Sequence, residues 1–423
     1  MARRVPTLAG AALLVLLVAA VALVWHPALA PAEVPERASF APAMLQRGKQ
    51  LAAIGYCSSC HTAAGGQPYA GGRGLETPFG TIYGTNITPD PETGIGQWSL
   101  AAFTRAMREG IDRQGHQLYP AFPYSHFTKL TDDDIAALYA FLMTRPPISA
   151  VPPPNALRFP YGIRPLIAGW NLLFLRQGPD QPDASKTEPW AHGAYLAEAL
   201  AHCGACHSPR NALGAEQAGH AYEGGEAEDW WAPPLGASSP APAAWTEEGL
   251  YNYLRSWDVD HAGAAGPMAP VVASLARVPE AEVRALAAYV AAMMPKPRPD
   301  QAARVQALID RAEQDPARRM PGAAIYAGAC AVCHDSGGQV PYTLRSLALH
   351  TSVQAPNPDD IVRAVVGGIK QPDERPGGFM PPFAGTLDDR QIADVVAYVR
   401  ARFSDKPAWT GIDDQVHAAG GRP

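Results

Sequence analysis

The chain of 423 residues has little charge and no long basic run. Only 17% of its residues are charged and its formal net charge is −6, which argues against nucleic acid as a partner. Its hydrophobic share of 47% is ordinary and indicates neither disorder nor a polytopic membrane protein. Strong two-residue periodicity, the sign of β-strands, is absent. Proline (43) and glycine (39) are abundant instead, which predicts small helical units joined by long loops.

The N-terminus carries one long uncharged run. Arg3 and Arg4 precede the 21 residues from Val5 to Trp25, none of which is charged. About 20 apolar residues suffice to cross a bilayer, whereas a cleaved signal usually has a core of about 7–15 residues. The length favours a membrane anchor, although Ala28-Leu29-Ala30 has the form that a signal peptidase cuts. We expect residues 1–30 to be an anchor or a signal peptide and the rest of the chain to be exported.

Cysteine occurs only inside one repeated pattern. The six cysteines form three copies of Cys-x-x-Cys-His, which are Cys57-Ser58-Ser59-Cys60-His61, Cys203-Gly204-Ala205-Cys206-His207 and Cys330-Ala331-Val332-Cys333-His334. This pattern is the attachment signal for c-type haem. On a helical turn its three residues share one face, so two thiols reach the vinyl groups while the imidazole reaches the iron. The sequence therefore predicts three covalently bound haem c groups.

Other uses of cysteine fit this pattern poorly. Structural disulfides would not all choose a two-residue gap followed each time by histidine. A zinc site needs four ligands from paired motifs, and a thioredoxin-like redox site would occur once. Covalent haem also agrees with an exported chain.

Similarity between the three segments extends beyond the motifs. A helical stretch that opens with glycine precedes each motif, at Gly48–Tyr56, Gly193–His202 and Gly322–Ala329. A later helix carries two apolar residues six apart, which are Ile135 and Phe141, Val283 and Tyr289, and Ile392 and Tyr398. We expect each glycine to allow close approach of the later helix, whose aromatic side chain fills the gap. A middle helix recurs at Phe103–Gly110, Leu250–Trp257 and Ile361–Gly368, with starts at Ser99, Thr246 and Pro358-Asp359.

These repeats predict an all-α fold of three tandem cytochrome c-like haem domains with long loops, plus the N-terminal hydrophobic helix. The expected boundaries are 40–146, 186–298 and 299–406 for the domains, 147–185 for a linker and 407–423 for a C-terminal tail. The linker contains an apolar stretch, Ile163–Leu175, whose 13 residues are too few to span a bilayer. It fits a buried helix between domains, an interfacial membrane segment, or a docking face for a partner.

A haem iron in an electron carrier needs a second axial ligand, commonly methionine. Met268 in Gly266-Pro267-Met268 and Met380 in Gly378-Phe379-Met380-Pro381-Pro382 both stand in a predicted loop before the last helix of their domain. We expect them to be the sixth ligands of the second and third haems, opposite His207 and His334.

The first domain departs from this pattern. Met268 stands 61 residues after His207, and the same distance after His61 leads to Phe122, which cannot bind iron. We expect His126, four residues further on in the same loop, to complete the site of His61. His116 or an open iron site are the alternatives, and Met107 and Met143 are expected in the core.

The sequence also resembles a known family. Pro78–Asp90, Thr93–Gly96 with Trp98, Cys206–Asn211 and Gly378–Phe383 are similar to the triheme cytochrome c subunit of bacterial membrane-bound dehydrogenases, such as the alcohol, gluconate and sorbitol enzymes. Alcohol dehydrogenase subunits of that family usually have methionine where Phe122 stands. Tyr119–Leu130 and Arg164–Trp170 look more like the branch paired with molybdenum hydroxylases, which act on aldehydes or N-heteroaromatic compounds.

The resemblance implies an electron-transfer subunit that is not catalytic alone. Its partners would be a molybdopterin dehydrogenase subunit and an iron–sulfur subunit, and its acceptor ubiquinone or a terminal oxidase. It would work on the periplasmic side of the bacterial inner membrane, anchored or peripherally attached. Two alternatives stay open, a subunit of a quinoprotein alcohol dehydrogenase and a haem peroxidase that uses an open iron in the first domain.

Overall fold

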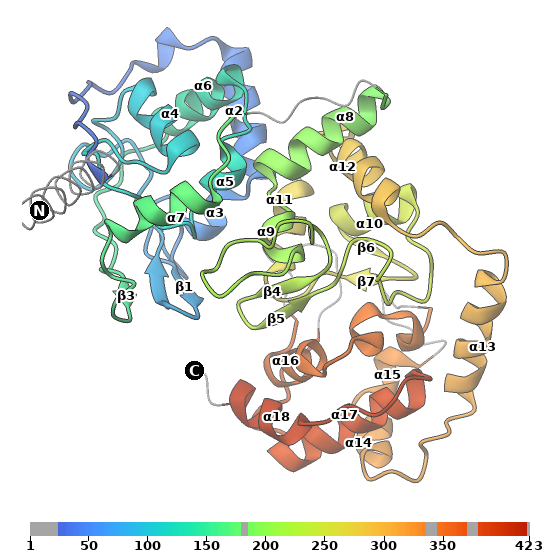
Figure 1. Cartoon of the computed structure of the whole chain (residues 1–423). Helices are drawn as coiled ribbons and strands as arrows, with labels where there is room; N and C mark the ends of the chain where they lie inside the picture. Colours follow the sequence, from blue (N-terminus) through green and yellow to red (C-terminus); the bar gives the residue numbers. More distant parts are fainter. Residues whose placement is uncertain (1–23, 179–184, 336–344, 370–379, 421–423) are drawn as a thin grey trace, which may run out of the picture. The chain divides into compact units, whose positions relative to one another are not determined.

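The computed structural model describes residues 24–178, 185–335, 345–369 and 380–420, which form two compact units (Figure 1). The first unit contains the described residues up to 178 together with Glu198–His202, and the second contains 185–197 and 203–420. The N-terminal hydrophobic helix expected within residues 1–30 lies mostly outside the described residues, which begin at Val24. Within the described ranges, no helix is long and apolar enough to cross a membrane.

The first unit is mainly helical and contains the first Cys-x-x-Cys-His motif. Its helices are η1 (Arg37–Ser39), α2 (Pro42–Ile54), α3 (Cys57–Cys60), α4 (Leu100–Glu109), α5 (Tyr124–Phe127), α6 (Asp132–Met143) and α7 (Leu166–Phe174). A small antiparallel sheet has the order β1 (Gly74–Thr77), β2 (Gly80–Tyr83), β3 (Ala156–Leu157). Helix α2 packs along α6, and Leu51, Ile54, Ile135 and Leu138 of these two helices are fully buried.

The second unit contains the other two motifs. Around the second motif the elements are α8 (Glu188–Tyr195), α9 (Gly204–His207), β4 (Gly225–Ala227), β5 (Trp230–Ala232), α10 (Glu247–Arg255), β6 (Trp257–Asp258), β7 (Ala262–Gly263), α11 (Met268–Leu275) and α12 (Glu280–Met293). The π-helical turn η2 (Leu196–Leu200) follows α8 and is divided between the units, because its residues from Glu198 on belong to the first. Around the third motif they are α13 (Gln301–Glu313), α14 (Gly322–Ala329), α15 (Ala331–His334), η3 (Leu347–Leu349), η4 (Thr351–Gln354), α16 (Asp359–Gly367), α17 (Asp389–Phe403) and α18 (Ile412–Gly420). Strands β4 with β5 and β6 with β7 form antiparallel hairpins.

The expected glycine contact between the first and last helix of each repeat is confirmed. A Cβ atom at Gly48, Gly193 or Gly322 would overlap a backbone carbonyl oxygen of the last helix, at Ala137, Ala285 and Asp394 respectively. It would also lie 2.8 to 2.9 Å from the Cβ atom of the predicted aromatic residue, which is Phe141, Tyr289 or Tyr398. The three repeats therefore share one packing contact, in which a glycine brings the backbones of two helices together.

The predicted helix starts are also confirmed. The Ser99 hydroxyl accepts a hydrogen bond from the Ala102 N–H at 3.2 Å, and the Thr246 hydroxyl accepts one from the Gly249 N–H at 3.0 Å. Helix α16 begins at Asp359, directly after Pro358. The predicted helix end at Trp257 is wrong, because α10 ends at Arg255 and Trp257 belongs to β6.

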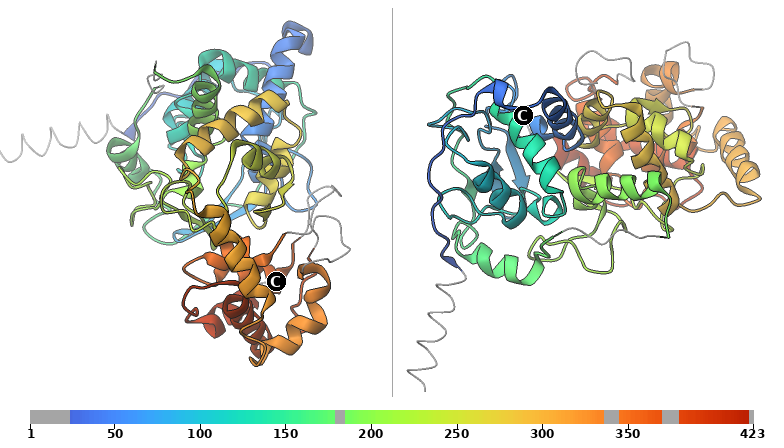
Figure 2. Two further views of the ribbon diagram at one scale, coloured as in Figure 1. Left: turned by 90° about the vertical axis from the view of Figure 1, so that its right-hand side faces the viewer. Right: turned by 90° about the horizontal axis from the view of Figure 1, so that it is seen from above.

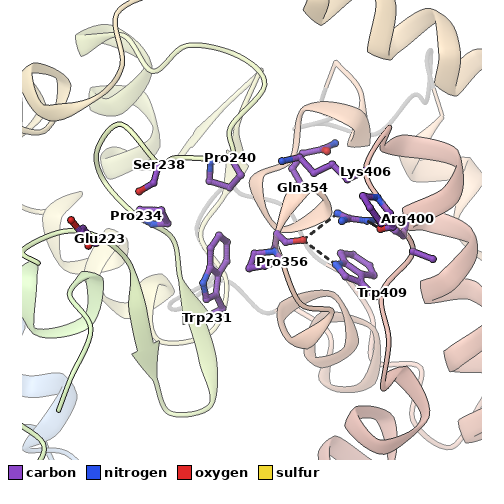
Figure 3. A pocket seen from close by; sticks show the side chains of 13 residues that line it. Glu223, Trp231, Pro234, Ser238, Pro240, Gln354, Pro356, Arg400, Lys406 and Trp409 are labelled. Carbon is purple, nitrogen blue, oxygen red and sulfur yellow. Dashed lines mark hydrogen bonds between the residues drawn. The ribbon is translucent and has the colours of Figure 1, made fainter.

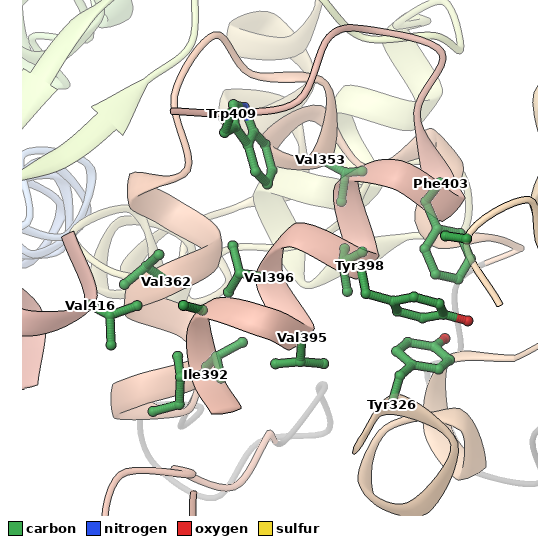
Figure 4. Close-up of a cluster of buried hydrophobic side chains, with 14 of the residues drawn as sticks. Tyr326, Val353, Val362, Ile392, Val395, Val396, Tyr398, Phe403, Trp409 and Val416 are labelled. Atoms are coloured by element: carbon green, nitrogen blue, oxygen red, sulfur yellow. The ribbon is translucent and has the colours of Figure 1, made fainter. Parts of the chain in front are cut away.

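The hydrophobic core around the third motif is formed mainly by α14, α16 and α17 (Figure 4). Val362, Ile392 and Val396 are buried in it, and the rings of Tyr326 and Tyr398 lie 5.2 Å apart. Each of the two tyrosine hydroxyls reaches an aspartate at the edge of the core, Asp335 or Asp315, at 2.9 Å.

The interpretation of Ile163–Leu175 as a buried helix is wrong. Helix α7 forms there, but Leu166, Leu172 and Leu173 are exposed and Ala168 is its one fully buried residue. The views in Figures 1 and 2 show α7 at an edge of the first unit. The helix forms as its composition predicts, but its leucines contribute little to the core.

Candidate functional site

Each Cys-x-x-Cys-His motif forms a short helical turn, at α3, α9 and α15. In each turn the backbone N–H of the histidine donates to the carbonyl of the first cysteine, at 3.1, 3.0 and 3.0 Å in chain order. This is the helical i to i−4 bond, which brings the histidine and the first cysteine to the same side of the turn. All six cysteines are free of disulfides, so all six thiols are available for attachment.

Backbone carbonyls orient two of the predicted proximal histidines. The Nδ1 atom of His61 lies 2.6 Å from the Thr85 carbonyl oxygen, and Nδ1 of His207 lies 2.7 Å from that of Pro233. Because a carbonyl oxygen can only accept, Nδ1 must carry the proton, and Nε2 then presents its lone pair. Burial lowers the pKa of His61, His207 and His334, which keeps all three imidazoles neutral. Neutral imidazole with a fixed tautomer is what an axial haem ligand requires.

Two of the thiols, those of Cys57 and Cys330, are protonated at neutral pH. Burial, with a contribution from Cys60, raises the pKa of Cys57 to about 12, and burial together with Cys333 raises that of Cys330 to about 11. Thiolate chemistry, as in a redox disulfide or a metal-thiolate site, needs the opposite shift. The residues therefore fit covalent haem attachment better than either alternative.

In two motifs the residue directly before the first cysteine has a left-handed backbone conformation. Tyr56 and His202, each directly before the first cysteine of its motif, have φ values of 36° and 38°. Within the first unit the Tyr56 hydroxyl lies 3.3 Å from Nδ1 of His202, and their ring centroids are 4.9 Å apart. No periodicity in the sequence marks these residues, because neither lies on a regular helix.

Of the two predicted methionine ligands, Met268 opens the short helix α11 and is half-buried. Its placement in a loop is therefore wrong in detail, although it still precedes α12. Met380 is half-buried against the core of the third repeat and exchanges two backbone hydrogen bonds with Ile369, at 2.8 and 3.0 Å. The residues Gly378-Phe379 of its motif lie outside the described residues. Iron ligation by either methionine stays a prediction.

Phe122, at the position where the second repeat has its methionine, lies in an aromatic cluster. Its ring centroid is 6.2 Å from that of Tyr124 and 5.3 Å from that of Phe127. His126 lies in the next helical turn, α5, and is buried. Its Nδ1 atom is 2.7 Å from the carbonyl oxygen of Glu198, the same arrangement that His61 and His207 have with their carbonyls.

The other residues weighed for the first iron site are less suitable. His116 is exposed, with Nδ1 3.1 Å from a carboxylate oxygen of Asp112. Met107 and Met143 are buried in α4 and α6, which confirms their assignment to the core. These placements favour His126, whose ligation of iron stays a prediction.

The second unit has a cavity of about 520 Å³ that no sequence pattern indicated (Figure 3). Trp231, Pro356 and Trp409 line it, and Arg400 stands at its wall with its guanidinium 4.5 Å from the Trp409 ring. Burial lowers the pKa of Arg400, whose guanidinium donates to the carbonyl oxygens of Pro407, Val353 and Ala355. We interpret Arg400 as a structural residue that fastens the segment after α17 to the third repeat.

Short helical turns with Cys-x-x-Cys-His, and histidines oriented by backbone carbonyls, define c-type cytochrome domains. The family described as "Cytochrome c" matches residues 45–146, and that described as "Cytochrome C oxidase, cbb3-type, subunit III" matches residues 317–399. The chain is 34% identical over 413 residues to the fructose dehydrogenase cytochrome subunit of Gluconobacter japonicus, covering 91% of this chain and 85% of that one. It is 36% identical over 394 residues to the cytochrome c subunit of the quinone alcohol dehydrogenase of Gluconacetobacter polyoxogenes, covering 87% and 82%.

The chain therefore belongs to the family of dehydrogenase cytochrome c subunits, and it is an electron-transfer cytochrome c. This confirms the resemblance seen in the sequence. The chain is also 47% identical over 405 residues to a subunit of the nicotinate dehydrogenase of Pseudomonas putida. That alignment covers 93% of this chain but 33% of the relative, so the chain spans about a third of that protein's length.

Proposed function

We propose that the chain carries three haem c groups and passes electrons from a partner dehydrogenase to an acceptor outside the bacterial cytoplasm. The thioether bonds would form at Cys57 and Cys60, Cys203 and Cys206, and Cys330 and Cys333. The proposal is supported mainly by the threefold repetition, since each motif follows a helix whose glycine packs on the last helix of its repeat. The haem irons supply one-electron chemistry, and the protein sets their potentials through axial ligands and burial.

For the iron ligands we propose His61 with His126, His207 with Met268, and His334 with Met380. The imidazole of His126 has the same carbonyl-held tautomer as His61 and His207, which supports a bis-histidine first haem. Thioether ligation favours the ferrous state, so exchange for imidazole lowers the potential. The first haem is then the entry point for electrons from a low-potential donor.

For the partner we propose a molybdopterin dehydrogenase with an iron–sulfur subunit that oxidises an N-heteroaromatic compound or an aldehyde. The 47% identity to a nicotinate dehydrogenase subunit supports the heteroaromatic choice, and so does phenylalanine at position 122. The chain would not be catalytic alone, and its acceptor would be ubiquinone or a terminal oxidase. It would be held at the periplasmic face of the inner membrane by the uncharged run Val5–Trp25.

The test is substrate-dependent reduction of the haems. Membranes that contain the complex should show reduced c-type absorbance within seconds of adding nicotinate, and a pyridine haemochrome assay should give three haems per chain. Reduction by ethanol alone would favour a quinoprotein partner. Rapid cyanide binding with a high-spin signal would instead indicate an open first iron and peroxidase chemistry.

A further inference from the structure

The outer face of α7 is apolar and exposed. Leu166, Leu172 and Leu173 are 54%, 66% and 60% exposed, and Leu166 and Leu173, seven residues apart, lie on one side of the helix. The preceding loop adds three more exposed side chains. We call this set the α7 face, and it consists of Phe159, Tyr161, Ile163, Leu166, Leu172 and Leu173. It holds six of the fourteen large exposed hydrophobic side chains in the described residues, concentrated in 15 positions.

The polar side of α7 faces the protein. Asn171 accepts a hydrogen bond from the Tyr124 hydroxyl at 2.6 Å and donates one to the Gln117 side chain at 3.0 Å. Ala168 beside it is buried. A helix on a water-exposed surface has the reverse arrangement, with its leucines inward and its amide outward. The exposed side of α7 is therefore better suited to an apolar medium than to water.

The charged residues within the sequence of this segment have one sign. Arg158, Arg164 and Arg176 are the charged residues between positions 156 and 178, and no acidic residue stands among them. Arginines around an apolar face are typical of helices that lie in the interface of a membrane with anionic phospholipids.

The start of the described chain is fastened next to the same helix. Arg105 donates to the Pro27 carbonyl at 2.8 Å, and the backbone of His26 contacts Gly115. Gln117, which holds Asn171 of α7, is two residues from Gly115, so their Cα atoms are at most about 8 Å apart. All views in Figures 1 and 2 show α7 near the start of the described chain. Trp25, the last residue of the uncharged run, therefore lies near α7.

We propose that the α7 face lies in the headgroup and upper acyl region of the bilayer, with its arginines at lipid phosphates. This proposal rests on the proposed anchoring by Val5–Trp25 and adds a second contact. One contact point leaves a domain free to rotate, whereas two fix which side of the first unit faces the lipid.

The test uses the full-length haem-loaded protein with one added cysteine, Leu173→Cys, carrying a nitroxide spin label. The native cysteines are blocked by haem, so only the added one reacts. The control is Met44→Cys, an exposed position of α2 in the same unit. Both proteins are added to vesicles of phosphatidylethanolamine and phosphatidylglycerol, and flotation is measured first. Collision rates of the label with oxygen, which concentrates in lipid, and with a water-soluble nickel complex are then compared.

At position 173 we expect the ratio of oxygen to nickel collisions to rise severalfold on vesicle binding, with no change at 44. Protein that floats while the label at 173 stays in water would overturn the α7 proposal and leave the anchor intact. Protein that does not float would overturn both. The label at position 173 could instead be protected from the nickel complex in the absence of vesicles, or only when the dehydrogenase is added. Either result would show that a protein covers the α7 face and would reject the lipid.

Discussion

Replacing Asp360 with asparagine is expected to remove a pH dependence of stability from the second unit. Asp360 lies in the first turn of α16 and is 8% exposed. One carboxylate oxygen accepts from the Trp231 N–H at 2.9 Å, and the other from the Ser352 hydroxyl at 3.0 Å. Burial raises the pKa of this carboxyl from 3.8 to about 6, although these two hydrogen bonds oppose the shift.

The folded state binds this proton more tightly than the unfolded chain does. Asp360 therefore stabilises the fold fully below about pH 4, and this contribution is lost as the pH rises to about 6. The difference between 3.8 and about 6 corresponds to about 3 kcal/mol in the free energy of unfolding. For a unit of this size the change in Tm is roughly 6–12 °C. Asparagine stays neutral and can keep both hydrogen bonds, so Asp360→Asn should be more stable than wild type at pH 7 and equal to it at pH 3.5.

Thermal unfolding of the oxidised holoprotein between pH 3.5 and 7.5 measures this difference. Asp413→Asn is the control, because it removes the same charge from an exposed position in α18. We expect the curves of wild type and Asp413→Asn to stay parallel while that of Asp360→Asn diverges upward above pH 4. Parallel curves for all three proteins would refute the reasoning.

Three further predictions concern the helix contacts and the iron ligands. Gly48→Ala should lower the free energy of unfolding of the first unit by about 1–3 kcal/mol, measured by chemical denaturation, because α6 leaves no space for the added methyl group. The control Gly169→Ala adds a methyl group in open space on α7 and should not destabilise the unit. Met268→Ala and Met380→Ala should each remove part of the weak absorbance band near the red edge of the oxidised spectrum. If a variant leaves both this band and the haem potentials unchanged, that methionine is not an iron ligand. His126→Met should abolish the bis-histidine signal in electron paramagnetic resonance. It should also raise the reduction potential of one haem by more than ~59 mV, which is a tenfold change in the equilibrium constant. Unchanged signals and potentials for all three haems would contradict this prediction.

Much of the repeat architecture could be predicted because it depends on local chemistry. Cys-x-x-Cys-His needs only one helical turn to bring its residues together, so the predicted attachment residues follow from spacing alone. Serine and threonine caps act on the backbone three residues away, as Ser99 and Thr246 do. The glycine and aromatic pairs were recognisable because close helix packing leaves few residue types possible at the contact, and Gly48, Gly193 and Gly322 meet that requirement.

The carbonyls that orient the histidines could not be predicted from the sequence. Thr85 and Pro233 stand 24 and 26 residues from His61 and His207, in segments with no helical periodicity. Any backbone can supply a carbonyl oxygen, so no residue type marks the partner. For the same reason the sequence could not predict Glu198, which is 72 residues from His126 in the chain and whose carbonyl oxygen binds the His126 imidazole.

The orientation of α7 was also decided only by tertiary structure. Its sequence, Leu166–Phe174, is apolar on nearly all sides, so periodicity predicts a helix but cannot say which side is buried. Two polar partners on other elements, Tyr124 and Gln117, make that choice by binding Asn171. Tyr124 and Gln117 are buried, and leaving their polar atoms without these hydrogen bonds would cost more than exposing leucines, so Asn171 turns inward and the leucines turn out. The sequence by itself determined the three Cys-x-x-Cys-His turns and most of the helices around them; the fold determined which apolar surface stays exposed.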